Sequence, residues 1–146
     1  MAYKGKYKLT KPEKYIGDGS KIWFRSLWEL SAFKYLENNP DVKNWSSEVE
    51  IKYINDLDGK PHRYYVDLYI LYTNGSVKLV EIKPKKQTIP PPEPKRKTVK
   101  YITECQTYIT NTSKWKAAQK ICDQRGYSFE IWTEVTLKNM GIKIIT

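Results

Sequence analysis

The sequence contains little histidine and little cysteine. Among its 146 residues there is one histidine, His62, and there are two cysteines, Cys105 and Cys122. These side chains are too few for a zinc site of the usual cysteine and histidine type. The cysteines stand 17 positions apart in one predicted helix. At about 1.5 Å per residue they would be roughly 25 Å apart, which is too far for a disulfide. We therefore expect two free thiols.

Long apolar runs are missing too. No stretch approaches the ~20 apolar residues that a membrane-spanning helix needs. The first eight residues include three lysines and form no apolar signal core. A glycine-rich phosphate-binding motif is also absent. We expect neither membrane insertion nor secretion.

Basic side chains are abundant. Lysine and arginine number 26 against 16 aspartates and glutamates, which gives a net charge of +10, and the bases are spread along the chain. This balance indicates a polyanionic partner, nucleic acid first and an anionic membrane surface second. The length suits one domain with a buried core.

The chain is organised around two predicted β-strands, residues 64–72 and 77–83, which join at Asn74-Gly75. Both are rich in aromatic and β-branched residues, as strands are. Charged residues interrupt them, among them Asp67 on the first strand, and Glu81 and Lys83 near the end of the second. Glu81 and Lys83 share one face of their strand because side chains alternate between faces.

The loop length decides whether Asp67 joins that face. A two-residue loop sets Asp67 opposite Ile82 and turns it to the wrong side of the sheet. A three-residue loop sets Asp67 opposite Lys83 and places all three charged side chains together. Both loop lengths are common when glycine is present, and a slip of one residue reverses every side chain. We predict the odd loop, or a bulge with the same effect.

Two carboxylates and a lysine on neighbouring strands suit metal-dependent cleavage of a phosphodiester bond. Carboxylate oxygens hold Mg²⁺ while leaving water in its shell. The ion can polarise the phosphate and lower the pKa of a bound water, and a lysine can orient that water or stabilise the developing charge. An exposed cluster of ion pairs among Asp67, Glu81 and Lys83 is the structural alternative, since charged pairs on strands are common.

The elements before this hairpin are an arm, a helix and a strand. Residues 1–19 alternate tyrosine and lysine and predict a basic N-terminal arm. Ser20 is a candidate cap for a helix over 20–38, and residues 45–55 predict a strand. Glu29 falls among apolar positions of that helix. Either Glu29 is a third acid near the metal, or it pairs with Arg25 four positions earlier.

After the hairpin, the pattern predicts a helix over 98–125 with a break near 110–113, because that segment is rich in threonine and serine. A strand over 129–133, a helical turn over 136–140 and a short strand over 142–145 follow. The resulting order, αβββαβ, favours an α/β (α+β) fold with a central mixed sheet flanked by helices. Apart from the arm, residues 20–146 form one predicted domain.

Several bases lie beside the predicted site or in the proline-rich segment 88–97. That segment should be extended and semi-rigid, and phosphate contacts supply most non-specific affinity for DNA. A solvated linker is the alternative there, and His62 suits an ordinary turn as well as a phosphate contact. The residues that we expect to contact DNA are Arg25, His62, Arg63, Lys85, Lys86, Lys95, Arg96 and Lys97.

Taken together, Glu29, Asp67 and Glu81-x-Lys83 resemble the PD-(D/E)xK nuclease superfamily, with its restriction-endonuclease-like core and an acid on the first helix. Val66 stands where the motif has proline. Ser26–Glu29 resembles the transposon end-cleaving endonucleases of TnsA type, which carry glutamine where this chain has Glu81.

Longer motifs resemble the head-completion nucleases of T4-type tailed phages. They are Ala2-Tyr3-x-Gly5-Lys6-Tyr7, Arg25-Ser26-Leu27-Trp28-Glu29, His62-Arg63-Tyr64 with Asp67, and Glu81-x-Lys83-Pro84-Lys85-Lys86-Gln87-Thr88. This resemblance implies a Mg²⁺-dependent DNA endonuclease, with Mn²⁺ as a substitute, that acts late in capsid maturation in the host cytoplasm. It also implies Asp67 and Glu81 as metal ligands, Lys83 as the catalytic lysine and Glu29 as the helix acid. Within this reading, Glu29 would hold a second ion or a metal-bound water, and the Ile82 carbonyl is a further candidate ligand.

A rival of another class remains at this stage. The chain would then be a non-catalytic structural protein of the phage portal or neck that grips the DNA end through its basic surface. Double-stranded DNA is the expected partner in both cases, and portal or neck proteins are candidate partners. Cleavage of paired strands would call for two sites, and so for a homo-oligomer.

Overall fold

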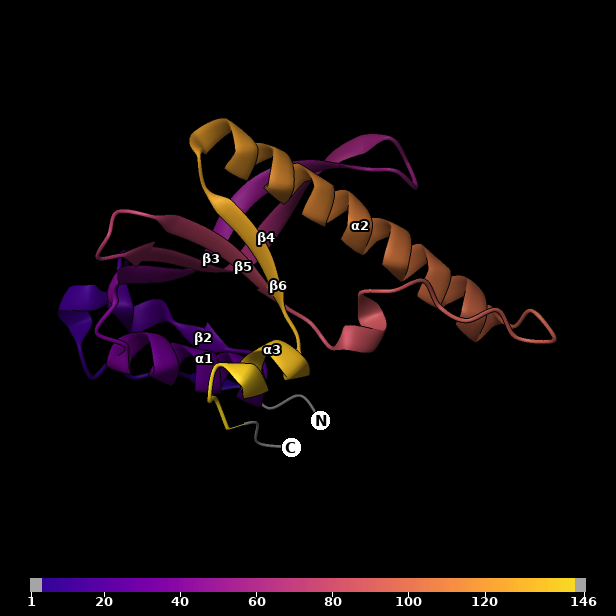
Figure 1. Ribbon diagram of the computed structural model, residues 1–146. Helices are drawn as coiled ribbons and strands as arrows, with labels where there is room; N and C mark the ends of the chain where they lie inside the picture. The colour runs from indigo at the N-terminus through magenta and orange to yellow at the C-terminus, as the bar shows by residue number, and fades with distance from the viewer. Residues whose placement is uncertain (1–3, 144–146) are drawn as a thin grey trace.

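A four-stranded mixed sheet forms the centre of the molecule, in the strand order β3-β4-β5-β6 (Figure 1). The structure is a computed structural model that describes residues 4–143. The strands are β3 (Val42–Asn55), β4 (Lys60–Tyr72), β5 (Val77–Ile82) and β6 (Ser128–Trp132). The first three are antiparallel neighbours, and β6 runs parallel to β5.

Helices cover both faces of this sheet. On one side lie α1 (Leu27–Asn38) and α3 (Glu134–Asn139), and on the other lies the long helix α2 (Val99–Arg125) (Figure 1). The short elements are β1 (Gly5–Lys6), which pairs with β2 (Trp23–Phe24), and the 3-10 turns η1 (Pro12–Lys14), η2 (Gly19–Lys21) and η3 (Lys85–Gln87). This arrangement confirms the predicted mixed sheet flanked by helices and the αβββαβ order.

The first helix begins later than the sequence predicted. Ser26, and not Ser20, is its cap, with the Ser26 hydroxyl accepting the backbone N–H of Glu29 at 3.1 Å. Residues 19–24 instead form η2 and β2, which bury Ile22 and Phe24. The prediction missed this because Ile22 and Phe24 continue the apolar pattern of the helix although they lie in an extended segment.

Helix α2 is continuous through the segment where a break was predicted. The hydroxyl-bearing residues there tie the helix to the tip of the β3–β4 hairpin. Asn55 donates through its side-chain amide to the Thr110 hydroxyl at 3.1 Å, and the Asp56 N–H donates to the Ser113 hydroxyl at 3.1 Å. Tertiary hydrogen bonds therefore outweigh the poor helix propensity of these residues. Gly126 ends the helix in the left-handed region, at φ 72°.

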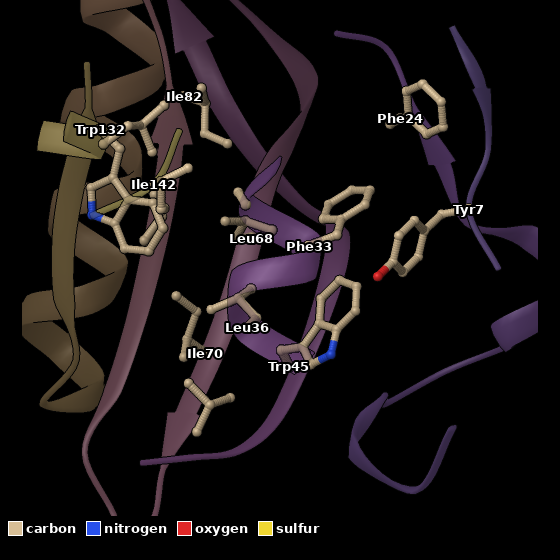
Figure 2. Packing of buried hydrophobic residues seen from close by; sticks show 14 of the residues in the cluster. Tyr7, Phe24, Phe33, Leu36, Trp45, Leu68, Ile70, Ile82, Trp132 and Ile142 are labelled. Atoms are coloured by element: carbon tan, nitrogen blue, oxygen red, sulfur yellow. The ribbon is translucent and has the colours of Figure 1, made fainter. Parts of the chain in front are cut away.

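One core cluster lies between α1 and the sheet. Phe33 and Leu36 of α1 point toward Trp45, Leu68 and Ile70 of β3 and β4, as Figure 2 shows. All five are almost completely buried. Burying each such side chain contributes on the order of 1.5–3 kcal/mol, so this packing anchors α1 on the sheet.

A second cluster lies under α2. Trp115, Ala118 and Cys122 of the helix pack against the other side of the sheet, where Tyr64 and Val66 are buried. The cysteines are free thiols, with Cys122 buried in this cluster, as predicted. The aromatic residue of this stretch of α2, Trp115, is thus part of the core.

From Lys4 onward, the segment expected to be a basic arm packs against the domain. Tyr7 is buried and its ring stacks edge-on against Phe33. The Lys14 ammonium donates to the Leu36 and Asn39 carbonyls, both at 2.9 Å, and so satisfies orphan carbonyls at the end of α1. Residues 1–3 lie outside the described part of the chain.

The predicted last strand, 142–145, is not present in its described part. Ile142 is buried but belongs to no strand, and residues 144–146 lie outside the described range. Helix α3 starts two residues before the predicted helical turn because Thr133 caps it, accepting the Thr136 N–H. Within residues 4–143, no helix is both long and apolar enough to cross a membrane.

Candidate active site

The β4–β5 register puts the two strand acids opposite each other. The ladder pairs Leu71 with Val77 and continues to Leu68 with Val80, and the next positions are Asp67 and Glu81. Tyr72 bonds to Ser76, which leaves a three-residue loop, 73–75. The odd loop is therefore confirmed. The predicted partner was wrong by two residues, because the loop closes one pair earlier and sets Asp67 opposite Glu81 instead of Lys83.

Asp67 lies where β4 and β5 stop pairing. The ladder ends at Leu68–Val80, and the Asp67 carboxylate takes over the next backbone donor, accepting the Ile82 N–H on Oδ2 at 2.7 Å. This bond fixes the side chain beside β5. It also explains why an aspartate is tolerated in a strand whose neighbours are buried: its carboxylate replaces a backbone acceptor.

Glu81 is buried, at 5% exposure, and belongs to the side of the sheet that faces α2. Its Oε2 accepts two hydrogen bonds, from the Tyr64 hydroxyl at 2.9 Å and from the Trp115 indole N–H at 3.3 Å. These donors come from β4 and α2, so the sheet and the helix together hold one carboxylate.

The two acids carry negative charge that no base offsets. Burial raises the pKa of Asp67 well above its usual range, and the nearby charge and hydrogen bonding of Glu81 raise that pKa further, against the lowering effect of the Ile82 N–H. No lysine or arginine within residues 4–143 forms an ion pair with either acid. In the absence of a cation, such a pair retains a proton near neutral pH more readily than an isolated aspartate does.

Glu29 contributes a third charge from the first turn of α1. Its Oε2 accepts the Arg25 backbone N–H at 2.9 Å. Burial raises the pKa of Glu29, and the charges of Glu48 and Glu81 add to the shift, while the Arg25 N–H and charge act against it. The charge of Glu29 in turn raises the pKa of Asp67. The structure therefore places Glu29 within electrostatic range of Asp67 and Glu81, and Glu29 accepts a hydrogen bond from the Arg25 backbone N–H.

A fourth acid, Glu48, was not predicted. The ladder between β3 and β4 pairs Ser47 with Leu68 and Val49 with Val66 but skips the position between them, where Glu48 and Asp67 stand at opposite register positions. Glu48 has φ 54°, the only positive φ among the described non-glycine residues, and its carboxylate pairs with the Arg25 guanidinium. Alternation along 48–54 marked Glu48 as polar, but no sequence signal announces a left-handed residue within a strand.

The same position separates the two core clusters. Val66, before Asp67, packs under α2, whereas Leu68, after it, packs against α1, although both are fully buried. The long β3–β4 hairpin thus changes the layer that it packs against at Glu48 and Asp67. The acids lie at this changeover.

Lys83 follows Ile82 immediately beyond β5 and is half-buried. Its backbone N–H bonds to the Trp132 carbonyl at 3.0 Å, which extends the β5–β6 pairing by one residue. Strand alternation puts its side chain on the Glu81 side. Within the described residues, the Lys83 ammonium forms no ion pair. The alternative of an exposed ion-pair cluster is therefore wrong, because Glu81 is buried and Lys83 is unpaired.

The donor set fits a hard divalent cation. The carboxylates of Asp67 and Glu81 lie close together, and one oxygen of each accepts a hydrogen bond from the protein. Their negative charges repel each other, and a bound cation would relieve this repulsion. Within residues 4–143, no three aspartate, glutamate, histidine or cysteine side chains lie close enough together to bind one metal ion. The charge of Glu81 raises the pKa of Asp67 more than the charge of Glu29 does, so Glu29 stands farther out than the Asp67–Glu81 pair.

The predicted DNA-contacting residues are exposed but engaged in different ways. Arg25 pairs with Glu48, His62 bonds to Asp58 at 2.8 Å across the hairpin turn, and Arg63 pairs with Glu50 at 3.6 Å. His62, in β4, thus bonds to a residue of the hairpin turn, and its contact with DNA stays a prediction. The others make no side-chain ion pair within the described residues: Lys85, Lys86, Lys95, Arg96 and Lys97.

The proline-rich segment runs beside the N-terminal half of α2, which projects beyond the sheet (Figure 1). A groove of about 510 Å³ lies between the two. Lys86, Ile89 and Pro92 line it on one side and Tyr108 on the other. The segment therefore follows a folded path along α2, while its lysines and arginine stay in solvent.

Comparison with known proteins shows the family of the chain. The chain is 40% identical over 148 aligned positions to the head completion nuclease of Enterobacteria phage T4, covering 98% of this chain and 99% of that protein. The family model described as TnsA-like endonuclease N terminal matches residues 39–134. That range includes Asp67, Glu81 and Lys83 but begins after Glu29. The chain belongs to the TnsA-like endonuclease family.

Proposed function

We propose that this protein is a metal-dependent DNA endonuclease that hydrolyses phosphodiester bonds during phage head completion. One observation supports this most strongly: Asp67, half-buried, and Glu81, buried, interact at the end of the β4–β5 ladder, and neither forms an ion pair with a base of residues 4–143. Uncompensated charge of this kind costs stability, so it indicates a site that is completed by a cation.

Asp67 and Glu81 would hold Mg²⁺, with Mn²⁺ as a substitute and the Ile82 carbonyl as a further ligand. A bound ion of this type supplies Lewis acidity that polarises the scissile phosphate and activates water. Glu29, farther out, would accept hydrogen bonds from the water around it, or hold a second ion. The Ile82 N–H, at 2.7 Å from Asp67 Oδ2, keeps the other Asp67 oxygen directed away from the backbone.

Lys83 would act on the substrate. Its ammonium forms no ion pair within the described residues, and the residue stands one pleat beyond Glu81 along the chain. A positive charge there would stabilise the negative charge that develops on the phosphate or orient the attacking water. An ion-paired lysine would be less available for either role.

The basic surface would bind the DNA backbone. The net charge of +10 favours association with double-stranded DNA in a salt-dependent way. The exposed Lys85 and Lys86 follow the site directly along the chain, and residues 95–97 come just before α2. The relative from phage T4 is named a head completion nuclease, so we place the activity in capsid maturation in the host cytoplasm, with portal or neck proteins as partners and a homo-oligomer for cleavage of both strands.

A plasmid assay tests the proposal. Supercoiled DNA is incubated with the protein in Mg²⁺, in Mn²⁺ and in excess chelator, and nicked and linear products are quantified. We expect cleavage in both metals and none with chelator. Absence of cleavage in either metal would favour a DNA-gripping structural protein of the portal or neck.

Single substitutions then test which residues are needed for cleavage. Asp67→Asn and Lys83→Ala should each reduce cleavage by at least about 100-fold, which is the upper end of what outer-shell changes cost, while DNA binding in a gel-shift assay stays within about twofold of wild type. Asp41→Asn and Lys34→Ala are matched controls, since both residues are exposed and lie outside the site. Wild-type cleavage by Asp67→Asn or Lys83→Ala would refute the assignment of that residue.

A further inference from the structure

We infer that Tyr64 and Trp115 are positioning residues that orient the Glu81 carboxylate for the cation. The inference rests on the proposed function, and it gives a functional role to two side chains of the hydrophobic core. Both donate to the same oxygen, Oε2, at 2.9 Å and 3.3 Å. Both are well buried, at 3% and 9% exposure.

The arrangement occupies one oxygen of Glu81 and leaves the other for a ligand. Within residues 4–143, the remaining hydrogen-bond partner of the Glu81 side chain is the Asp67 carboxyl group, which is the other proposed ligand. A carboxylate fixed by two donors from different elements cannot rotate freely, because turning it would break both bonds. Ligating carboxylates are commonly held in this way by outer hydrogen bonds, which set their orientation.

The chemical type of the donors matters. A lysine or arginine beside Glu81 would orient it equally well but would also neutralise the charge that attracts a cation. A phenol and an indole are neutral donors. Burial and the charge of Glu81 raise the pKa of Tyr64, so its hydroxyl keeps the proton that it donates. The acid is therefore oriented while its negative charge remains unpaired.

Tyr64 is itself held in place from its other side. The Lys114 ammonium lies 5.5 Å from the centre of the Tyr64 ring and 5.9 Å from that of Tyr53. Tyr53 packs edge-on against Tyr64 with 6.3 Å between ring centres. Tyr53 is equally buried but does not contact Glu81, so it is a matched control for loss of a tyrosine hydroxyl from this cluster.

The experiment compares Tyr64→Phe, Trp115→Phe and Tyr53→Phe. Binding of Mn²⁺ is measured by titration calorimetry without DNA, and the Mg²⁺ concentration for half-maximal plasmid cleavage is measured separately. Thermal melting without metal shows whether each variant is folded. Tyr64→Phe and Trp115→Phe should each weaken Mn²⁺ binding and raise the Mg²⁺ requirement about 10-fold or more, and Tyr53→Phe should change neither.

The KM for DNA separates positioning from general damage. We expect it to stay at the wild-type value in Tyr64→Phe and Trp115→Phe, since neither residue is exposed to the substrate. Wild-type Mn²⁺ affinity in both variants would overturn the inference, as would a loss of affinity in Tyr53→Phe equal to theirs. If one variant does not fold, the other decides, because the two residues lie on different elements.

The same data keep this inference distinct from the proposed function. Wild-type protein that binds Mn²⁺ and cuts DNA, with unchanged variants, refutes only the positioning role. Wild-type protein that neither binds Mn²⁺ nor cuts DNA refutes the metal-dependent nuclease, and the positioning role with it.

Discussion

Two glutamates are buried among residues 4–143, and their surroundings differ in kind. Glu37, on α1, is fully buried, and both of its oxygens are bonded: the Tyr7 hydroxyl donates to Oε1, and the Thr10 and Lys11 N–H groups donate to Oε2 at 3.0 Å and 2.6 Å. Glu81, on β5, is also buried but has donors on one oxygen only.

The difference separates a structural acid from a reactive one. Glu37 ties the N-terminal segment to α1, and its hydrogen-bonding capacity is fully used, so nothing remains for a ligand. Glu81 faces a second acid, Asp67, whose pKa its charge raises. Burial alone therefore does not mark a functional acid in this fold. What marks it is a second acid as its neighbour and a charge that is not paired with a base.

The largest expected effect is on cleavage, and it should separate the two glutamates. Glu81→Gln should reduce DNA cleavage by at least about 100-fold, because the substitution removes a charge that the cation needs. Glu37→Gln should cleave at the wild-type rate at temperatures where it is folded, since it lies in the other core cluster. Initial rates of plasmid nicking in Mg²⁺ measure both. Equal losses in the two variants would break the comparison.

The next effect is on stability, and the two substitutions should change the free energy of unfolding in opposite directions. Glu37→Gln places an amide N–H₂ against the donors of Tyr7, Thr10 or Lys11, and should lower the free energy of unfolding by about 1–3 kcal/mol. Glu81→Gln should raise it in metal-free buffer, because a buried charge facing Asp67 disappears while Tyr64 and Trp115 keep an acceptor. Urea denaturation in chelator measures both values.

The smallest effect concerns pH. The folded pKa of Asp67 lies well above its ordinary value of 3.8, so between these two values the folded state binds more protons than the unfolded state. The metal-free protein should therefore lose stability as pH rises from about 4 through the raised pKa, and Asp67→Asn should lack that loss.

Added Mg²⁺ gives the control for this pH series. A bound cation favours the ionised acid, so it should restore stability at neutral pH and have less effect near pH 4, where protons compete with it. Melting temperatures across pH, with Mg²⁺ and with chelator, measure the difference. If the melting temperature falls with pH equally in wild type and in Asp67→Asn, another titrating group causes the loss of stability.

Much of the site could be predicted from the sequence because strand alternation is a local rule. The pattern of residues 64–83, together with an odd loop, was enough to place Asp67 with Glu81 on one face. Glu37 carried a signal that was overlooked: it follows Phe33 by four positions on the buried stripe of α1, where a charge needs a partner. Glu48 carried none, since its left-handed backbone depends on the bend of the whole hairpin.

The sequence by itself determined the order of the elements, the mixed sheet, the basic surface and the convergence of two strand acids, because periodicity and charge act over a few neighbouring residues. Only the tertiary structure decided which acid keeps a free oxygen. The bonds that fix Glu81 join residues 17 and 34 positions apart, and the Tyr7–Glu37 bond spans 30. Such pairs meet only when α2 and the N-terminal segment pack on the sheet and on α1, which no local pattern specifies.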